Sequence, residues 1–402
     1  MARVGIFSQR AILQCRLWIL VSAASVAIPI AKADVHRVFV VSGSGLNCTG
    51  AQFTRIQDAI DAAAPNDSVH ICGGIYNEQP HIDKSLDIDA DPEAFLVPIN
   101  MLANANSLAD GGPIAAAFYA SGAPHVEISG LTVDTIGSGI SECAPRLLGV
   151  YYQNASGVLA HVKVRNTKLG PTLNGCQSGT GIFVESGQGG RSVVEIRNCP
   201  ISEYQKNGIT ANEVGTVVTI QGNVVTGVGP TPGAAQNGIQ VGYGATGKVE
   251  RNVVTGNLWF PCQVAATCVA VATDILVFES DKVKVIDNTV GETQIGVFAA
   301  ANDGLVSHNR VFSISVFDGI RIEGNGNNAK ENKVFESAES DVFVQGNDNS
   351  IEENILADAP VGVLEAAGSA GNRIRNNRYI DVLVPVQDPP GGSLAGKVSP
   401  ER

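Results

Sequence analysis

The sequence predicts an all-β fold: a right-handed parallel β-helix of about ten coils, a single-chain solenoid with a capping helix at its N-terminal end. Two recurring phrases predict it, one centred on Asn and one opened by Gly or Asp, together with a composition of 45 glycines and only 5% aromatic residues. Strands this short cannot each bury a face alone, whereas coils stacked ~4.8 Å apart give them a shared core.

The chain begins with an expected secretory signal at residues 1–33. Three arginines precede the apolar stretch 17–30, and Ala31-Lys32-Ala33 fits an A-x-A cleavage site. An apolar stretch of 14 residues is shorter than the ~20 that a transmembrane helix needs. We therefore expect a secreted or periplasmic protein without a transmembrane segment.

The formal net charge of the whole chain is -12, and loss of the signal would remove four cations and no acid. A chain this acidic lacks the basic patch of a nucleic-acid-binding protein. The same charge disfavours direct binding of a polyanionic sugar unless a divalent cation bridges the two.

Seven cysteines follow the signal, which in an oxidising compartment suggests three disulfides and one thiol. The pairs that we expect, although spacing alone does not fix connectivity, are Cys48 with Cys72, Cys143 with Cys176, and Cys262 with Cys268, leaving Cys199. No Cys or His spacing predicts a metal site.

Residues 34–112 are expected to form an N-terminal cap and the first strands. Apolar residues at helical spacing, from Phe53 to Ala63, predict an amphipathic capping helix over 53–64. The coils are assigned to 113–386, and the Pro- and Gly-rich segment 387–402 is expected to be a disordered tail.

The Asn phrase marks positions 198, 223, 252, 288, 309, 332, 354 and 377. Asn tolerates the left-handed conformation of a sharp bend, and stacked Asn side chains can hydrogen-bond along the column, so its expected role is structural. Gly/Asn/Asp clusters such as 324–327 and 346–349 are interpreted as turns. Calcium is the one cofactor considered for them, although no cluster alone carries enough carboxylates.

The stretch FTRIQDAIDAAAPNDSVHICGGIYNE, residues 53–78, resembles the opening of pectin methylesterases and of periplasmic copper-maturation β-helix proteins. The later coils resemble the repeats of pectate lyases, polygalacturonases and alginate epimerases. This resemblance to the pectate lyase-like superfamily covers roughly residues 38–386 and implies the fold. The catalytic motifs of these families, among them G-H-G, R-I-K and D-P-H-D, are absent, so no particular activity is implied.

Long insertions at 134–148, 168–180, 226–237 and 255–273 precede the Gly-opened strand, so all of them stack on one edge of the coils. In the families named above, that edge flanks the polysaccharide-binding sheet. Alternation along these strands places certain aromatic, amide and charged residues outward. The expected substrate-binding residues are Tyr151, Gln153, Phe183, Asn212, Gln240 and Arg321. A stacked surface ladder without a ligand is the alternative for the same residues.

Four carboxylates are candidates for catalysis. Asp274, Asp318 and Asp341 stand at the start of the Gly-opened strand, and two coil steps would separate the first two by ~10 Å, near the upper end of an inverting glycosidase pair. Glu185 beside Phe183 is the competing candidate. An Asp at a strand start is also a common turn residue, which is the structural alternative.

Two functions follow from these expectations. The first is a polysaccharide-active enzyme, a hydrolase or lyase that uses carboxylates on the loop-flanked sheet. The second is a non-catalytic carbohydrate-binding or cell-surface structural protein. In both cases we expect a monomer whose partner is a polysaccharide.

Overall fold

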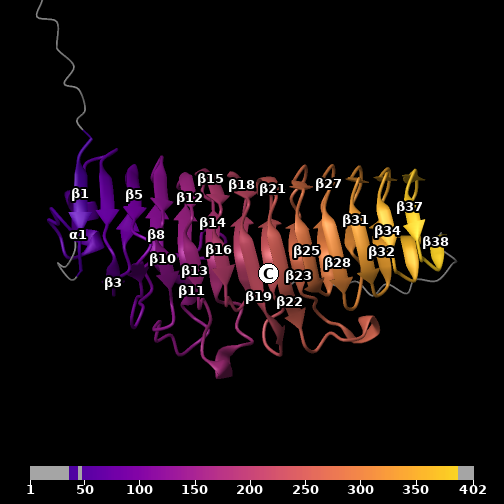
Figure 1. Cartoon of the computed structure of the whole chain (residues 1–402), viewed down its shortest axis with the longest axis horizontal. Helices are drawn as coiled ribbons and strands as arrows, with labels where there is room; N and C mark the ends of the chain where they lie inside the picture. Colours follow the sequence, from indigo (N-terminus) through magenta and orange to yellow (C-terminus); the bar gives the residue numbers. More distant parts are fainter. Residues whose placement is uncertain (1–35, 44–47, 388–402) are drawn as a thin grey trace, which may run out of the picture. The chain divides into compact units, whose positions relative to one another are not determined.

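The computed structural model describes residues 36–43 and 48–387, which fold as a parallel β-helix whose coils each contribute one strand to three long sheets (Figure 1). Within each sheet, neighbouring coils pair in parallel, so the chain visits sheets A, B and C in turn. The prediction of a right-handed parallel β-helix is confirmed. The stack is longer than the expected ten coils, because sheet A holds 13 strands and sheet B holds 12.

The strands of sheet A are β1 (Val38–Val41), β2 (Ser68–Ile71), β5 (Leu86–Ala90), β9 (Val126–Ser129), β12 (Gly157–Ala160), β15 (Ser192–Arg197), β18 (Thr216–Gln221), β21 (Thr246–Glu250), β24 (Lys284–Ile286), β27 (Leu305–Ser307), β30 (Asn328–Lys330), β33 (Ser350–Glu352) and β36 (Arg373–Arg375). The strands of sheet B are β3 (Gly74–Tyr76), β6 (Ala94–Leu96), β10 (Thr132–Asp134), β13 (Lys163–Arg165), β16 (Pro200–Ser202), β19 (Val224–Thr231), β22 (Val253–Trp259), β25 (Thr289–Thr293), β28 (Arg310–Ile314), β31 (Lys333–Ser337), β34 (Ile355–Ala357) and β37 (Arg378–Ile380).

The strands of sheet C are β4 (His81–Ile82), β8 (Pro113–Ser121), β11 (Arg146–Gln153), β14 (Thr180–Glu185), β17 (Asn207–Asn212), β20 (Asn237–Gly242), β23 (Thr273–Phe278), β26 (Ile295–Ala300), β29 (Ile320–Glu323), β32 (Ser340–Gln345), β35 (Val361–Glu365) and β38 (Val384–Gln387). A short strand, β7 (Ala105–Asn106), pairs antiparallel with β8 and is a departure from the repeat. Two short 3-10 turns, η1 (Pro171–Leu173) and η2 (Ala265–Thr267), lie in the loops between sheets B and C.

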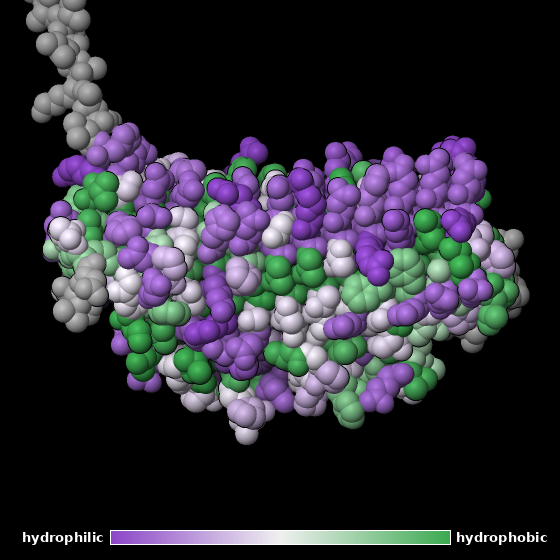
Figure 2. Space-filling model, in the orientation of Figure 1, coloured by the Kyte–Doolittle hydropathy of each residue, from purple (hydrophilic) through white to green (hydrophobic). Residues whose placement is uncertain are grey.

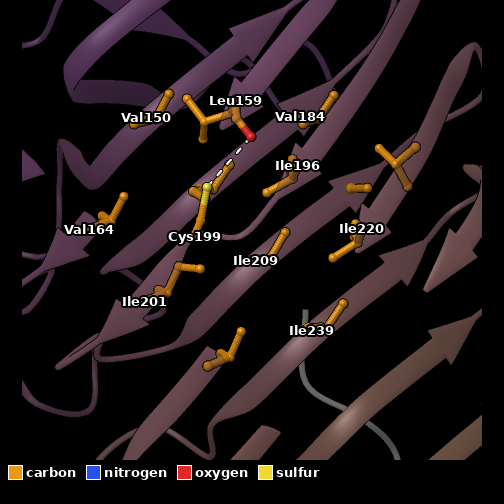
Figure 3. Packing of buried hydrophobic residues seen from close by; sticks show 14 of the residues in the cluster. Val150, Leu159, Val164, Val184, Ile196, Cys199, Ile201, Ile209, Ile220 and Ile239 are labelled. Carbon is orange, nitrogen blue, oxygen red and sulfur yellow. Dashed lines mark hydrogen bonds between the residues drawn. The ribbon is translucent and has the colours of Figure 1, made fainter. Parts of the chain in front are cut away.

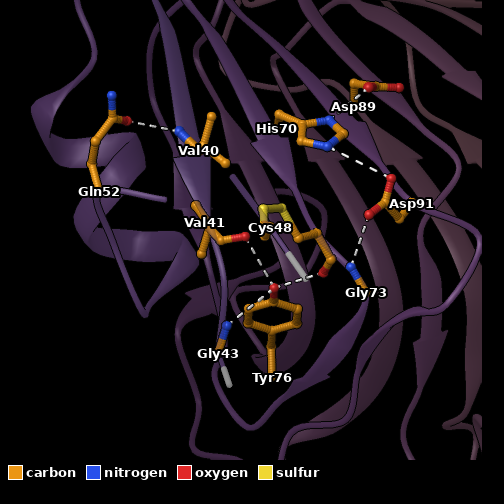
Figure 4. The surroundings of a disulfide bond; sticks show 11 residues. Val40, Val41, Gly43, Cys48, Gln52, His70, Gly73, Tyr76, Asp89 and Asp91 are labelled. Carbon is orange, nitrogen blue, oxygen red and sulfur yellow. Dashed lines mark hydrogen bonds and ion pairs between the residues drawn. A yellow bond between two sulfur atoms is a disulfide. The ribbon is translucent and has the colours of Figure 1, made fainter. Parts of the chain in front are cut away.

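Helix α1 (Ile56–Ala62) lies inside the expected range 53–64 and buries Ile56, Ala59 and Ile60 against the first coil. Nearby, the Tyr76 hydroxyl donates to the Cys72 carbonyl at 2.7 Å and accepts from the Gly43 amide (Figure 4). Helix α1 and the Tyr76 side chain together cover the N-terminal end of the core, which would otherwise present open strand edges.

Inward-facing Val, Ile and Leu side chains from all three sheets form one continuous core (Figure 3). Strict alternation along each strand produces it, because every second side chain of a strand points to the same face. The sheets run without interruption across residue 113, where the sequence suggested a boundary, since β5 pairs with β9 and β6 with β10. The expected signal 1–33 and residues 388–402 of the expected tail lie outside the described residues.

The Asn column is a hydrogen-bonded ladder buried between sheets A and B. The Nδ2 of Asn288 donates to Oδ1 of Asn309 at 3.0 Å, and the Asn288 amide donates to the same oxygen at 2.9 Å. The pattern repeats from Asn223 to Asn377. The predicted stacking is confirmed, but the left-handed residue is the one before the ladder position, for example Asp287 with φ 57° and His308 with φ 58°.

The first member of this column differs from the expectation. Asn198 adopts the left-handed conformation, with φ 54°, and Cys199 takes the ladder position. The Cys199 amide donates to Asn223 Oδ1 at 2.9 Å, and its thiol faces the Leu159 carbonyl at 3.5 Å (Figure 3). A cysteine therefore ends the ladder, because a thiol fits the apolar core of the coils before it.

All three expected disulfides are present: Cys48–Cys72, Cys143–Cys176 and Cys262–Cys268. Cys199 is the buried free cysteine among the described residues, and burial raises the pKa of its thiol to about 12. No helix of the described segments is long and apolar enough to cross a membrane.

Candidate functional site

A groove of about 430 Å³ lies on the outer face of sheet C, over strands β8 to β20. It is named here the sheet C groove. Its floor is formed by side chains of β14, β17 and β20, and its walls come from the segment 107–113 and from the loops around Cys143 and Gln177. These loops extend from one edge of the coils (Figure 1). The groove therefore lies where insertions interrupt the repeat, which is the region that the sequence analysis singled out.

Parallel register fixes the floor of the groove. Phe183, Thr210 and Gln240 lie opposite one another on successive strands. Gln240 donates to Asn212 Oδ1 at 3.1 Å and accepts from Asn207 Nδ2 at 3.2 Å. Of the expected substrate-binding residues, the structure brings three together at this floor: the half-buried ring of Phe183 and the amides of Asn212 and Gln240.

An aromatic stack leads into the groove. The rings of His81, Tyr119, Tyr151 and Phe183 follow one another on successive strands of sheet C with centroid separations of 4.6, 5.4 and 5.4 Å. Register places each ring over the next, at spacings typical of favourable aromatic pairs. Phe183, the last ring, lines the groove and is partly exposed.

Tyr151 and Gln153 do face outward from sheet C, but they are buried. The cover comes from the segment around β7, whose Asn106 carbonyl accepts from Gln153 Nε2 at 2.6 Å. Both side chains are therefore covered, so they are not exposed in the groove as direct contact with a ligand would require. They support the groove from beneath one of its walls.

Glu185 is fully buried, and its carboxylate accepts four hydrogen bonds. Oε1 accepts from Ser107 Oγ at 2.8 Å and the Ala109 amide at 3.0 Å, and Oε2 accepts from the Leu108 amide at 3.0 Å and the Tyr151 hydroxyl. Burial beside this carboxylate raises the pKa of the Tyr151 hydroxyl far above its ordinary value. Three of the four donors belong to the wall segment 107–109, so Glu185 holds that segment in place, and the fourth donor ties the carboxylate to Tyr151 on β11.

The wall carries an ion pair that alternation could not reveal. Arg146 at the start of β11 donates to Asp110 Oδ1 at 2.8 Å, and both residues line the groove. Desolvation opposes ionisation of Asp110, but the Gly112 amide and the Arg146 charge outweigh it, so the pKa of Asp110 lies below its usual value. Cys143–Cys176 braces the same wall.

Asp274 and Asp341 stand where other coils have Gly, and this position points into the corner toward sheet B. A Cβ built on the equivalent Gly238 would meet Val254 at 2.2 Å. Asp274 accordingly accepts from Asn257 Nδ2 at 2.8 Å and the Gly291 amide at 2.7 Å, and burial raises its pKa well above the usual value. These two candidate catalytic carboxylates are therefore enclosed at the corner and do not lie on the outer face of sheet C.

Asp341 accepts from Ser337 Oγ at 2.9 Å, and its second oxygen has no hydrogen-bond partner. Burial raises the pKa of Asp341 to about 8. A carboxyl with one unpaired buried oxygen is more stable protonated, because desolvation disfavours the charged form.

Asp318 and Arg321 form a buried network distant in sequence from the groove residues. Arg321 donates to Asp318 at 2.8 Å and to Glu323 at 2.8 Å, and its guanidinium lies 3.9 Å from the centre of the Phe343 ring. Burial raises the pKa of Asp318 despite the Arg321 charge. Only 2% of Arg321 is exposed, so this expected substrate-binding residue is enclosed in the network and does not line the sheet C groove.

The loop braced by Cys262–Cys268 covers a different part of sheet C. With Leu276 and Phe298 it forms a separate apolar cluster, and Trp259 Nε1 donates to the Gly233 carbonyl at 2.6 Å. The outer face of sheet C thus carries the open groove over β8 to β20 and, at β23 and β26, an apolar cluster covered by this loop.

Several groove residues escaped the sequence analysis, chiefly Asp110, Arg146, Asn207 and Glu213. The first two depend on the hairpin that joins β7 to β8, in which the Ser107 amide donates to the Gly112 carbonyl at 2.9 Å. The Asp110-Gly111-Gly112 run is a turn signal that could have revealed the hairpin.

Comparison with known proteins supports this architecture. The family model "Right handed beta helix region" matches residues 148–378. A solved GH136 lacto-N-biosidase from Eubacterium ramulus superposes with a TM-score of 0.60 at 13% identity, covering 86% of this chain and 68% of the other. A mutant of the periplasmic alginate epimerase AlgG superposes with a TM-score of 0.52 at 12% identity, covering 78% and 73%. No curated protein matches in sequence.

Proposed function

Because this chain belongs to the right-handed beta helix family, we propose that its sheet C groove binds an extended carbohydrate chain. One observation carries the proposal: the aromatic stack ends at the partly exposed ring of Phe183, and the amides of Asn212 on the next strand and of Gln240 on the strand after it line the same groove. A sugar ring presents an apolar face and a rim of hydroxyl groups, and these side chains offer a partner for each.

The shape of the site supports a polymer or oligomer over a single sugar. The groove crosses several successive strands, which are spaced ~4.8 Å apart, so a ligand lying along the stack would contact equivalent positions coil after coil. Two of the similar solved structures carry names of carbohydrate-acting enzymes, a lacto-N-biosidase and an alginate epimerase, and this is in keeping with the proposed class of ligand.

Charge favours a neutral glycan. The chain carries a net charge of -12. Of the two cations that line the groove, Arg146 pairs with Asp110, and Lys206 donates to the Ala235 carbonyl at 3.0 Å. A polyuronate would meet repulsion unless a divalent cation bridged the charges. We propose a neutral chain as the ligand, in a secreted or periplasmic protein, and the three disulfides support that location.

Any cleavage of the bound chain would require carboxylates that reach it. Asp110 and Glu213 line the groove, whereas the carboxylates of Asp274, Asp318 and Asp341 are enclosed in the fold. The low pKa of Asp110 suits a base or nucleophile and does not suit a proton donor at neutral pH. We therefore assign binding to the groove and test cleavage through Asp110.

The experiment is isothermal titration of the purified protein with neutral oligosaccharides and with oligouronates, with and without calcium. Phe183→Leu removes the flat ring, and Phe335→Leu on β31 is the matched control, because that ring is also half-buried but lies on sheet B. We expect saturable binding of a neutral glycan, weakened at least about tenfold by Phe183→Leu alone, which corresponds to ~1.4 kcal/mol.

Equal effects of the two substitutions, or no binding by any neutral glycan, would refute the proposal. Reducing ends are measured in parallel with wild-type protein and Asp110→Asn. Product release that Asp110→Asn abolishes would make the site catalytic, and binding without product would establish the non-catalytic alternative.

A further inference from the structure

Three side chains that can bind a metal ion converge on the outer face of sheet A, on a different sheet from the sheet C groove. One ligand atom each from Asp87, His125 and Glu127 lies within 4.8 Å of the others. They line a surface hollow of about 350 Å³, together with His36, Asn66 and Ser68.

The backbone fixes this convergence. Asp87 on β5 and Glu127 on β9 are register partners, and both point outward because their strand neighbours Leu86, Ile88, Val126 and Ile128 are buried. His125 directly precedes β9, and its carbonyl accepts from the Leu86 amide at 3.1 Å. Two hydrogen-bonded strands therefore hold the three groups together without relying on flexible loops.

The charges at this position are unusual for the sheet. Like charges directly opposite on neighbouring strands destabilise a sheet. Elsewhere on this face acids pair with cations: Glu195 with Arg197 at 3.3 Å, Glu250 with Lys248 at 2.9 Å, and Glu352 with Arg375 at 2.7 Å.

Hydrophilic residues dominate the side of the stack on which sheet A lies, at the top of Figure 2. In the register, Ser68 and Val158 flank the Asp87–Glu127 pair, and neither brings a positive charge. No side-chain hydrogen bond or ion pair within the described part of the chain engages Asp87, His125 or Glu127. The two opposed carboxylates and the imidazole thus present their lone pairs to one hollow with nothing to neutralise the acids.

We propose that Asp87, His125 and Glu127 bind one divalent transition-metal ion, with Zn²⁺ as the best match. An imidazole nitrogen with two carboxylate oxygens suits zinc, and three protein ligands leave a coordination position open to water. The ion would link strand β5 to strand β9. The carboxylates of Asp87 and Glu127, which repel each other without it, would then bind the same ion.

A second group on the same sheet lacks the chemistry. His70 and Asp91 approach Cys72, but Cys72 is bonded to Cys48, so no thiolate is available (Figure 4). His70 already faces Asp89 at 2.9 Å and Asp91 at 3.6 Å. His70 provides the matched control, since it is also an imidazole among carboxylates on sheet A.

The test is titration of untagged, chelator-treated protein with ZnCl2, followed by calorimetry and by thermal unfolding. We expect one zinc ion per chain and a higher unfolding temperature with zinc. His125→Ala and the double variant Asp87→Asn/Glu127→Gln should each weaken binding by more than about tenfold and abolish the thermal shift. His70→Ala should bind as the wild type does.

Three results would overturn the proposal: no saturable zinc binding by the wild type, unchanged binding by His125→Ala, or loss of binding in His70→Ala. Equal binding of Ca²⁺ would also overturn it, because the imidazole would then contribute nothing. Circular dichroism of each variant confirms that the coils are intact, which the exposed position of Asp87 and His125 favours.

Discussion

Replacing Glu185 by Gln should release one wall of the sheet C groove. The four donors of Ser107, Leu108, Ala109 and Tyr151 divide into two pairs, one on each carboxylate oxygen. A glutamine amide accepts from one pair through Oε1, but its Nε2 is a donor and cannot accept from the other pair.

The cost follows from these contacts. On the Nε2 side the hydroxyl can rotate and accept from the glutamine amide, so one backbone N–H is left without an acceptor, which costs about 1–3 kcal/mol. The segment 107–109 can avoid this cost by detaching from Glu185, because its amides then become exposed to water. Such local unfolding requires less free energy than unfolding of the whole protein. We therefore expect a small change in global stability and a large loss of local order.

Hydrogen exchange measures this directly. In Glu185→Gln the amides of Leu108 and Ala109 should exchange at least tenfold faster, a change of ~1.4 kcal/mol in opening free energy. Glu195→Gln, at an exposed ion pair on sheet A, is the control and should alter nothing at the wall. Unchanged exchange in Glu185→Gln would refute the role of this carboxylate as the anchor.

Three further predictions concern the scaffold. Asn309→Ala leaves the amide and Nδ2 of Asn288 without their acceptor, so urea unfolding should show a loss of about 2–5 kcal/mol; a loss below ~1 kcal/mol would contradict the ladder's importance. Cys199→Asn extends the ladder by one member, so the unfolding temperature should stay level or rise, and a clear fall would count against that interpretation. Burial raises the pKa of Asp341 to about 8, so the folded state keeps a proton that the unfolded chain releases above about pH 4; the free energy of unfolding should fall between about pH 5 and pH 8, and the fall should be smaller in Asp341→Asn.

The fold could be predicted because each coil repeats the same local chemistry. Asn288, Asn309 and Asn332 mark one corner, and alternation then assigns every strand face. The same reasoning placed Phe183 and Gln240 at a common surface, since register in a stacked sheet follows directly from the period.

The site was only partly predictable because its decisive contacts come from outside the repeat. The hairpin of β7 and β8 covers Tyr151, and its wall segment turns Glu185 from an exposed candidate into a buried anchor. Alternation also fails at the corner position near the start of the sheet C strands, where Asp274 replaces Gly and points toward sheet B. Neither effect has a signature in the period itself.

The Asn ladder runs from Cys199 to Asn377, whereas Cys48–Cys72 and Cys143–Cys176 both lie before it in the chain. The two halves of the coil stack are therefore stabilised by different means, the first by covalent cross-links and the second by a continuous line of amides. A reducing environment would break Cys143–Cys176, which braces one wall of the groove, and the loop bridge Cys262–Cys268, but it would leave the ladder of amides intact. The proposed binding of a glycan should therefore depend on the oxidation state of the surroundings, whereas the hydrogen bonds of the ladder should not.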